Sequence, residues 1–160
     1  MVYSFARVSA VVHMKVKDYY PNGKRYWLRL HEKGGKYHEV PAHHTAEQYL
    51  DEYIKAPGIA EEKNKPLFRT TRGQSRALTD KALDRERAWA LIKRRAKDAG
   101  VSPEIRCHSF RATGITEYLR NGGTIEKAAQ IAAHESTRTT QLYNWTDDEL
   151  TLDEIERIVI

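Results

Sequence analysis

The sequence predicts a mixed α+β domain that is mainly helical and has a small antiparallel β-sheet near its N-terminus. Two observations predict this class. Residues 15–41 contain short β-rich runs separated by turn-forming residues, among them the pair Gly34-Gly35. Much of the remaining chain consists of stretches with apolar residues at helical spacing, several of them preceded by a capping residue. A length of 160 residues is enough for one domain with its own core.

Composition narrows the classes of function. The formal net charge is +5, from 27 basic and 22 acidic residues. This excess is compatible with a phosphate-rich partner, but an ordinary basic domain has it too. Cys107 is the one cysteine, which excludes an internal disulfide and fits a reducing compartment. Because no apolar run reaches membrane length and no secretory signal is visible, we expect no membrane association and a cytoplasmic location.

The first part of the chain predicts one helix and three strands. Residues 2–14 carry apolar side chains on one helical stripe, although no capping residue precedes them. Residues 15–19, 26–30 and 37–40 have the alternation and the β-favouring residues of short strands. The last two of these are expected to form a hairpin around Gly34-Gly35.

Two helices are expected in the middle of the chain. Thr45 begins a pattern like a capping box, and the helix that it opens should end near Pro57. A longer helix is expected over residues 80–99, with Thr79 as its cap and either Trp89 or Ala90 facing the core.

The last part of the chain predicts three further helices. The first covers about residues 109–120 and ends at an Asn-Gly-Gly run, and Thr124 starts the second, which reaches about residue 132. The third carries Tyr143, and residues 152–158 form a short amphipathic piece at the end of the chain.

Residues 107–143 contain the side chains needed to cut a phosphodiester without a metal. His108 and Arg111 share a helix face, His134 falls in a connection, and Tyr143 lies on the last helix. A guanidinium can grip a phosphate through two parallel hydrogen bonds, an imidazole moves protons near neutral pH, and a tyrosine can be a covalent nucleophile. Taken singly, each residue also fits a structural role, and a His-x-x-Arg pair alone has almost no specificity.

The order and spacing of these residues resemble the tyrosine recombinases, the phage integrase family. In that family a His-x-x-Arg pair opens a helix. A Gly/Ala-His-x-Ser-x-x-Thr-Thr segment follows, and then the nucleophilic tyrosine. The segments HSFRATG, from His108, and AAHES with TTQLY, ending at Tyr143, are similar to these motifs.

Two earlier motifs extend the resemblance over nearly the whole chain. The family's first catalytic arginine lies in a Gly-Leu-Arg-x-Ser-Glu run, which resembles the segment around Arg7, although Ala10 stands where the family has its acidic residue. That carboxylate supports neighbouring residues in the family's active site. The family also has a Gly-Lys-Gly-x-Lys-x-Arg-x-Val-Pro hairpin whose first lysine is the general acid. This lysine corresponds to Lys33. Lys36 is the runner-up for the general acid, and the resemblance favours a backbone-phosphate contact for it.

The resemblance implies the tyrosine recombinase catalytic-domain fold and a site-specific recombinase or integrase activity on double-stranded DNA. Tyr143 would attack a phosphodiester and form a 3′-phosphotyrosyl link, while Arg7 and Arg111 would hold the non-bridging oxygens. Because the protein–DNA bond stores the energy of the broken bond, neither a metal nor another cofactor is expected.

Three further side chains would handle protons and hydrogen bonds. Lys33 would protonate the departing 5′-oxygen and His108 would manage the tyrosine proton. His134 would donate a hydrogen bond to the phosphate.

The resemblance also implies a domain organisation and partners. Residues 1–160 are expected to be a single catalytic domain, a fragment that lacks the family's N-terminal DNA-binding domain, from a bacterial or phage-encoded protein. We expect Lys36, Arg72 and Arg76 to contact DNA. Family members associate on DNA as tetramers, often by exchanging a C-terminal segment, and we expect the same of this chain.

Three alternatives remain open at this point. A type IB topoisomerase has a similar fold and active site but relaxes DNA. A non-catalytic DNA-binding module would fit the helix-turn-helix character of residues 124–145, and Ala10 could reflect decay of the site. A metal-dependent nuclease would need an acidic cluster, which the sequence lacks.

Overall fold

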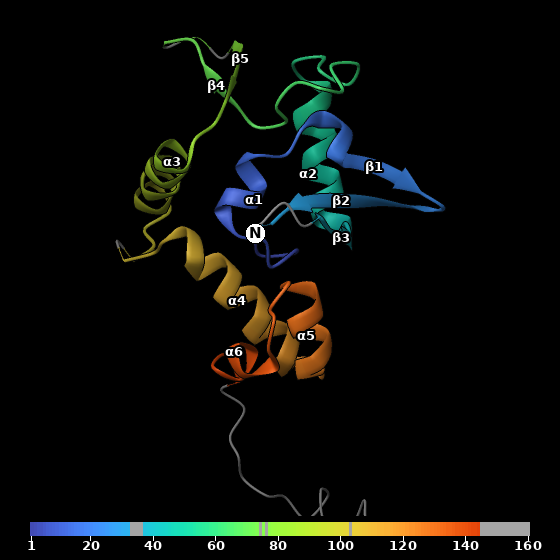
Figure 1. Ribbon diagram of the computed structural model, residues 1–160. Coiled ribbons are helices and arrows are strands. Elements are labelled where there is room, and N and C mark those ends of the chain that lie inside the picture. The colour runs from blue at the N-terminus through green and yellow to red at the C-terminus, as the bar shows by residue number, and fades with distance from the viewer. Residues whose placement is uncertain (33–36, 74, 76, 103, 145–160) are drawn as a thin grey trace, which may run out of the picture.

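The computed structural model describes residues 1–32, 37–73, 75, 77–102 and 104–144. Within these residues the mixed, mainly helical class is confirmed. Six α-helices accompany a three-stranded antiparallel sheet near the N-terminus, as expected, and a separate two-stranded sheet (Figure 1).

The N-terminal half consists of the three-stranded sheet with α1 and α2. Its elements are α1 (Val8–Val12), the 3-10 helix η1 (Val16–Asp18), β1 (Tyr19–Asn22), β2 (Arg25–His31), β3 (Tyr37–Pro41) and α2 (His44–Lys55). The strands are antiparallel in the order β1-β2-β3, so the hairpin expected between the second and third strands is confirmed.

Two expectations for this half were wrong in their bounds. The first helix covers five residues instead of thirteen, because Phe5 has φ +49° and a right-handed helix cannot include that conformation. The first strand begins at Tyr19, since Asp18 accepts a hydrogen bond from the Lys15 backbone N–H (2.8 Å) and closes a 3-10 turn just before it.

The C-terminal half is helical apart from one hairpin. Its elements are β4 (Arg69–Thr71), β5 (Leu78–Ala82), α3 (Arg85–Asp98), α4 (Cys107–Arg120), α5 (Ile125–Ile131) and α6 (Thr137–Gln141). The three helices expected between residues 109 and 143 are confirmed, except that Tyr143 follows α6 and lies in a turn.

The helix expected over residues 80–99 was wrong at its start. Residues 78–82 form β5, and the Thr79 hydroxyl pairs with that of Thr70 on the neighbouring strand (2.6 Å) instead of capping a helix. The cap of α3 is Asp84, whose carboxylate accepts a hydrogen bond from the Arg87 N–H (2.7 Å). Trp89 does not face the core, because 49% of its surface is exposed.

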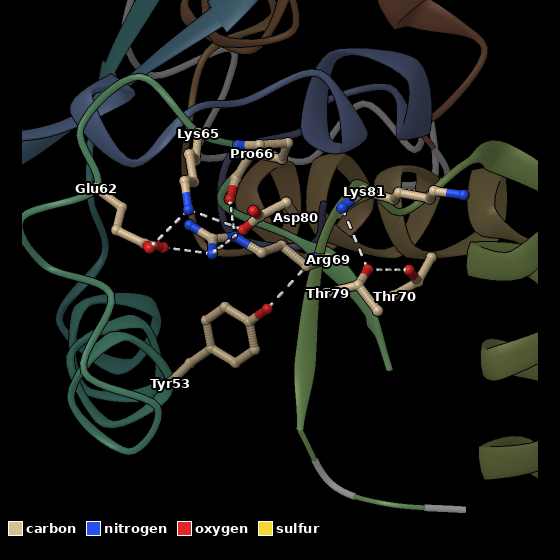
Figure 2. Close-up of polar contacts among 9 residues, drawn as sticks. All are labelled: Tyr53, Glu62, Lys65, Pro66, Arg69, Thr70, Thr79, Asp80 and Lys81. Atoms are coloured by element: carbon tan, nitrogen blue, oxygen red, sulfur yellow. Dashed lines mark hydrogen bonds and ion pairs between the residues drawn. The ribbon is translucent and has the colours of Figure 1, made fainter. Parts of the chain in front are cut away.

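A buried arginine holds the β4–β5 hairpin against the N-terminal half. The Arg69 guanidinium pairs with Glu62 and Asp80, and its Nε donates to the Pro66 carbonyl (2.7 Å), as Figure 2 shows. Lys65 bridges the same two carboxylates at 2.9 Å each. This network joins the segment after α2 to both strands of the hairpin, which fixes the entry of the chain into α3.

The buried apolar side chains form two clusters. The first contains residues of α1 and of the three-stranded sheet, and the second contains Phe5 with residues of α4 and α5. Ile131 packs against both clusters. The N-terminal segment therefore belongs to the core of the C-terminal helices, and the Phe5 carbonyl accepts a hydrogen bond from Arg111 of α4.

Candidate active site

The hydroxyl of Tyr143 lies beside the imidazole of His108. His108 is in the first turn of α4 and Tyr143 is in the turn after α6, and the His108 Nε2 and Tyr143 Oη atoms are 2.9 Å apart. The Tyr143 ring packs against the second apolar cluster, and its backbone carbonyl accepts a hydrogen bond from the Thr116 hydroxyl (3.3 Å). The tyrosine is thus held at its ring, its backbone and its hydroxyl.

The imidazole of His134 stacks on the ring of the same tyrosine. The two rings are parallel to within 12°, with their centroids 6.3 Å apart. A Schellman turn at the end of α5 presents the histidine: the His134 N–H bonds to the Ala129 carbonyl (2.9 Å), and the Ala133 N–H bonds to the Gln130 carbonyl (3.1 Å). Ala133 occupies the left-handed position of this turn, with φ +49°.

The environment of His134 keeps its ring neutral. Burial, followed by the positive charges of Arg111 and Arg7 and by His108, lowers the pKa of His134 from 6.5 to about 4. Its Nδ1 is 2.8 Å from the hydroxyl of Thr140, a fully buried residue of α6. When that hydroxyl donates to Nδ1, the ring proton lies on Nε2, which is the arrangement of a neutral hydrogen-bond donor.

Arg111 is buried and tied to two distant backbone carbonyls. It is 2% exposed, its Nη1 donates to the Phe5 carbonyl, and its Nη2 donates to the Ala132 carbonyl (2.7 Å). Burial, and then the neighbouring charge of Arg7, lower the pKa of Arg111 from its usual range. A guanidinium has five N–H donors, so three remain after these two bonds.

Arg7 is the second cation of the site. It precedes α1, and its Nη1 is 2.6 Å from an oxygen of Glu32, at the end of the β2 strand. Two clefts meet at Arg7. One, of about 710 Å³, also contains His108 and Arg111, and the other, of about 980 Å³, also contains Glu32 and His134.

The structure therefore brings together five of the six residues expected to be catalytic, namely Arg7, His108, Arg111, His134 and Tyr143. Lys33, expected to be the general acid, lies outside the described residues, as do Lys36 and Arg76, expected to contact DNA. Arg72 is exposed in the turn between β4 and β5 and lines neither cleft.

Sequence reasoning missed two residues of the site. Thr140 is part of the TTQLY segment, so that motif could have indicated it. Glu32 directly precedes Lys33, but no local pattern signals that its carboxylate reaches Arg7, twenty-five positions earlier in the chain.

Comparison with known proteins settles the family. Residues 1–149 match the phage integrase family. The chain belongs to that family. It is 30% identical over 140 residues to the tyrosine recombinase XerD of Corynebacterium glutamicum, covering 86% of this chain and 43% of the relative. It is 28% identical over 147 residues to the XerD of Mycobacterium leprae, with the same coverage. The chain thus spans less than half the length of these curated relatives.

Solved structures confirm the tyrosine recombinase catalytic-domain fold. XerA recombinase superposes with a TM-score of 0.76 at 24% identity, covering 98% of this chain and 53% of that protein. XerH recombinase, in a complex with its difH substrate before cleavage, superposes with a TM-score of 0.76 at 23% identity, covering 98% of this chain and 44% of that protein.

Two features are absent from the described residues. No three His, Cys, Asp or Glu side chains in that part of the chain are grouped so that they could hold a metal ion. None of its helices is both long enough and apolar enough to cross a membrane.

Proposed function

We propose that this chain is the catalytic domain of a site-specific DNA recombinase or integrase, which cuts and rejoins DNA through a phosphotyrosyl intermediate at Tyr143. The observation that carries the proposal is the 2.9 Å approach of the His108 imidazole to the Tyr143 hydroxyl, beside two arginines that face a common cleft. A tyrosine placed between a proton acceptor and an anion-binding site is equipped to attack a phosphate.

The cleavage step forms one bond and breaks another. The Tyr143 oxygen attacks the phosphorus, its proton passes to Nε2 of His108, and the bond from phosphorus to the 5′-oxygen breaks. The family resemblance supplies this polarity, and it assigns the proton taken up by the departing oxygen to Lys33. Rejoining is the reverse reaction, with the freed 5′-hydroxyl as the nucleophile.

The cations stabilise the negative charge that grows on the phosphate. Arg111 has three N–H donors left after its two backbone bonds, and Arg7 lines the cleft beside it. Removing one such donor typically slows a reaction on the order of 10²–10³-fold. Neutral His134 adds a hydrogen bond from Nε2 without adding charge.

The proposed substrate is double-stranded DNA, and the names of the relatives support this assignment. All four are named recombinases, and XerH was solved on its difH substrate, which favours strand exchange over simple relaxation. We extend the proposal to a cytoplasmic location and to assembly on DNA through the C-terminal segment. Residues 145–160 of that segment lie outside the described residues.

Covalent trapping tests the proposal. The protein is mixed with a pool of nicked duplexes, so that the cut end diffuses away, and the denatured mixture is examined for protein that carries DNA. We expect an adduct that Tyr143→Phe abolishes. Tyr118→Phe is the matched control, because Tyr118 packs in the same apolar cluster. An adduct that survives in Tyr143→Phe would refute the assignment of the nucleophile.

A further inference from the structure

Among the described residues, Glu32 is the one residue that forms a hydrogen bond or an ion pair with the Arg7 side chain. The Arg7 side chain is 43% exposed, whereas that of Glu32 is 9% exposed, and the closest oxygen and nitrogen atoms are 2.6 Å apart. A mostly buried carboxylate therefore holds a half-exposed guanidinium at the point where the two clefts of the site meet.

The two arginines of the site are fixed in different ways. Arg111 is fixed by the backbone, through the carbonyls of Phe5 and Ala132. Arg7 has no comparable backbone acceptor for its side chain in the described residues. A free arginine side chain has about 2 kcal/mol of rotamer entropy, so a cation that must meet a phosphate in one geometry needs an anchor.

The helix α1, which follows Arg7 directly, contains no acidic residue that could anchor the guanidinium. Ala10, three positions after Arg7, has no carboxylate, and it is completely buried among apolar neighbours of the first cluster. Leu28 and Leu30 of β2 belong to that cluster, so α1 packs against the strand that ends next to Glu32. Glu32 supplies the carboxylate that α1 lacks.

We propose that Glu32 is a positioning residue for Arg7, and that its carboxylate holds the guanidinium so that the remaining N–H groups face the scissile phosphate. The inference rests on the proposed function. It assigns the anchor of Arg7 to Glu32, the residue after β2, because α1 offers no carboxylate. Burial of the carboxylate supports this role, because a buried carboxylate pairs with its cation more strongly than an exposed one does.

A double-mutant cycle on cleavage tests the inference. The rate of adduct formation is measured with saturating nicked duplex for the wild type, Glu32→Gln, Arg7→Ala and the double variant. We expect Glu32→Gln to slow adduct formation on the order of 10- to 100-fold when Arg7 is present, and by less than about threefold in the Arg7→Ala background. A residue that only supports the fold would slow both backgrounds equally.

Glu39→Gln is the matched control. Glu39 lies on β3 and pairs with Arg29 at 2.7 Å, but this pair is exposed and lines neither cleft. We expect its rate to stay within about twofold of the wild type. Restoring the carboxylate with Glu32→Asp should recover part of the rate lost in Glu32→Gln.

Each other outcome overturns the inference. Equal slowing in both backgrounds would assign Glu32 to the fold, and faster cleavage by Glu32→Gln would mean that the carboxylate competes with the phosphate for Arg7. If the wild type forms the adduct and the variants show either of these two results, the proposed function stands and only the role of Glu32 is refuted. A wild type that forms no adduct removes the proposed function, and the inference with it.

Discussion

Ala133 occupies a backbone conformation that costs this protein stability, and replacing it with glycine should recover that cost. The residue has φ +49° in the turn that presents His134. The left-handed conformation costs a residue with a Cβ atom about 1–2 kcal/mol, whereas glycine adopts it freely. Glycine loses about 0.4–1 kcal/mol more than alanine through the entropy of the unfolded chain. We therefore expect Ala133→Gly to raise the free energy of unfolding by about 0.5–1 kcal/mol.

The chain contains its own control for this prediction. The helices α3 and α4 end in the same type of turn, and there the left-handed positions are Gly100 and Gly122, with φ +65° and +81°. A Cβ atom added at Gly122 would meet nothing within 4 Å, so Gly122→Ala changes the conformational cost alone. It should lower the free energy of unfolding by about the amount that Ala133→Gly raises it.

Urea unfolding at equilibrium measures both variants. At the size of this domain, 1 kcal/mol also corresponds to a change of about 2–4 °C in melting temperature. Because Ala133→Gly leaves the hydrogen bonds of the turn in place, adduct formation should change by less than about threefold. A destabilised Ala133→Gly variant, or a Gly122→Ala variant as stable as the wild type, would show that backbone conformation does not set the cost of this turn.

Three further perturbations address the site. A Cβ atom at Gly114 would lie 2.1 Å from the Val2 carbonyl oxygen, so Gly114→Ala should lower the melting temperature and slow adduct formation, whereas unchanged melting would contradict the close packing. Arg111→Lys leaves at least one of two buried carbonyls without its donor, so we expect a loss of about 1–3 kcal/mol in urea unfolding as well as slower cleavage. The pKa of His134 falls from 6.5 to about 4 on folding, so the unfolded chain binds more protons between these values and stability should decrease as the pH falls through them. In His134→Asn that part of the pH dependence should be absent from the unfolding midpoints, and an unchanged profile would argue against the buried neutral ring.

Local patterns predicted the elements whose ends are set by neighbouring residues. Thr124 caps α5 through the Lys127 N–H, and the three-stranded sheet follows its turn residues. The expected helix over residues 80–99 was wrong at its start. The β5 strand forms by pairing with β4, and this pairing cannot be predicted from the few residues around Thr79. Trp89 was wrongly placed in the core, because α3 buries only Ala88 and Ala96.

Prediction of the site had a similar limit. The motifs singled out five residues that the structure brings together, since each proposed role needs a particular residue type at a particular spacing. They could not indicate the residues that hold those side chains in place through backbone groups. The Phe5 backbone carbonyl accepts a hydrogen bond from Arg111, and a residue of any type could supply that carbonyl. Phe5 also has a left-handed backbone conformation, which the phenylalanine side chain does not predict.

The bonds of Arg111 connect three parts of the chain that lie far apart in sequence. One guanidinium joins α4 to a carbonyl 106 positions earlier and to another 21 positions later. The cation site consequently has no local precursor: a nascent or partly unfolded chain cannot assemble it from any one segment. We expect the ability to break DNA to appear only at the last stage of folding and to be lost at the first stage of unfolding. Under the proposed function, this chain would therefore not cleave DNA while its own structure is incomplete.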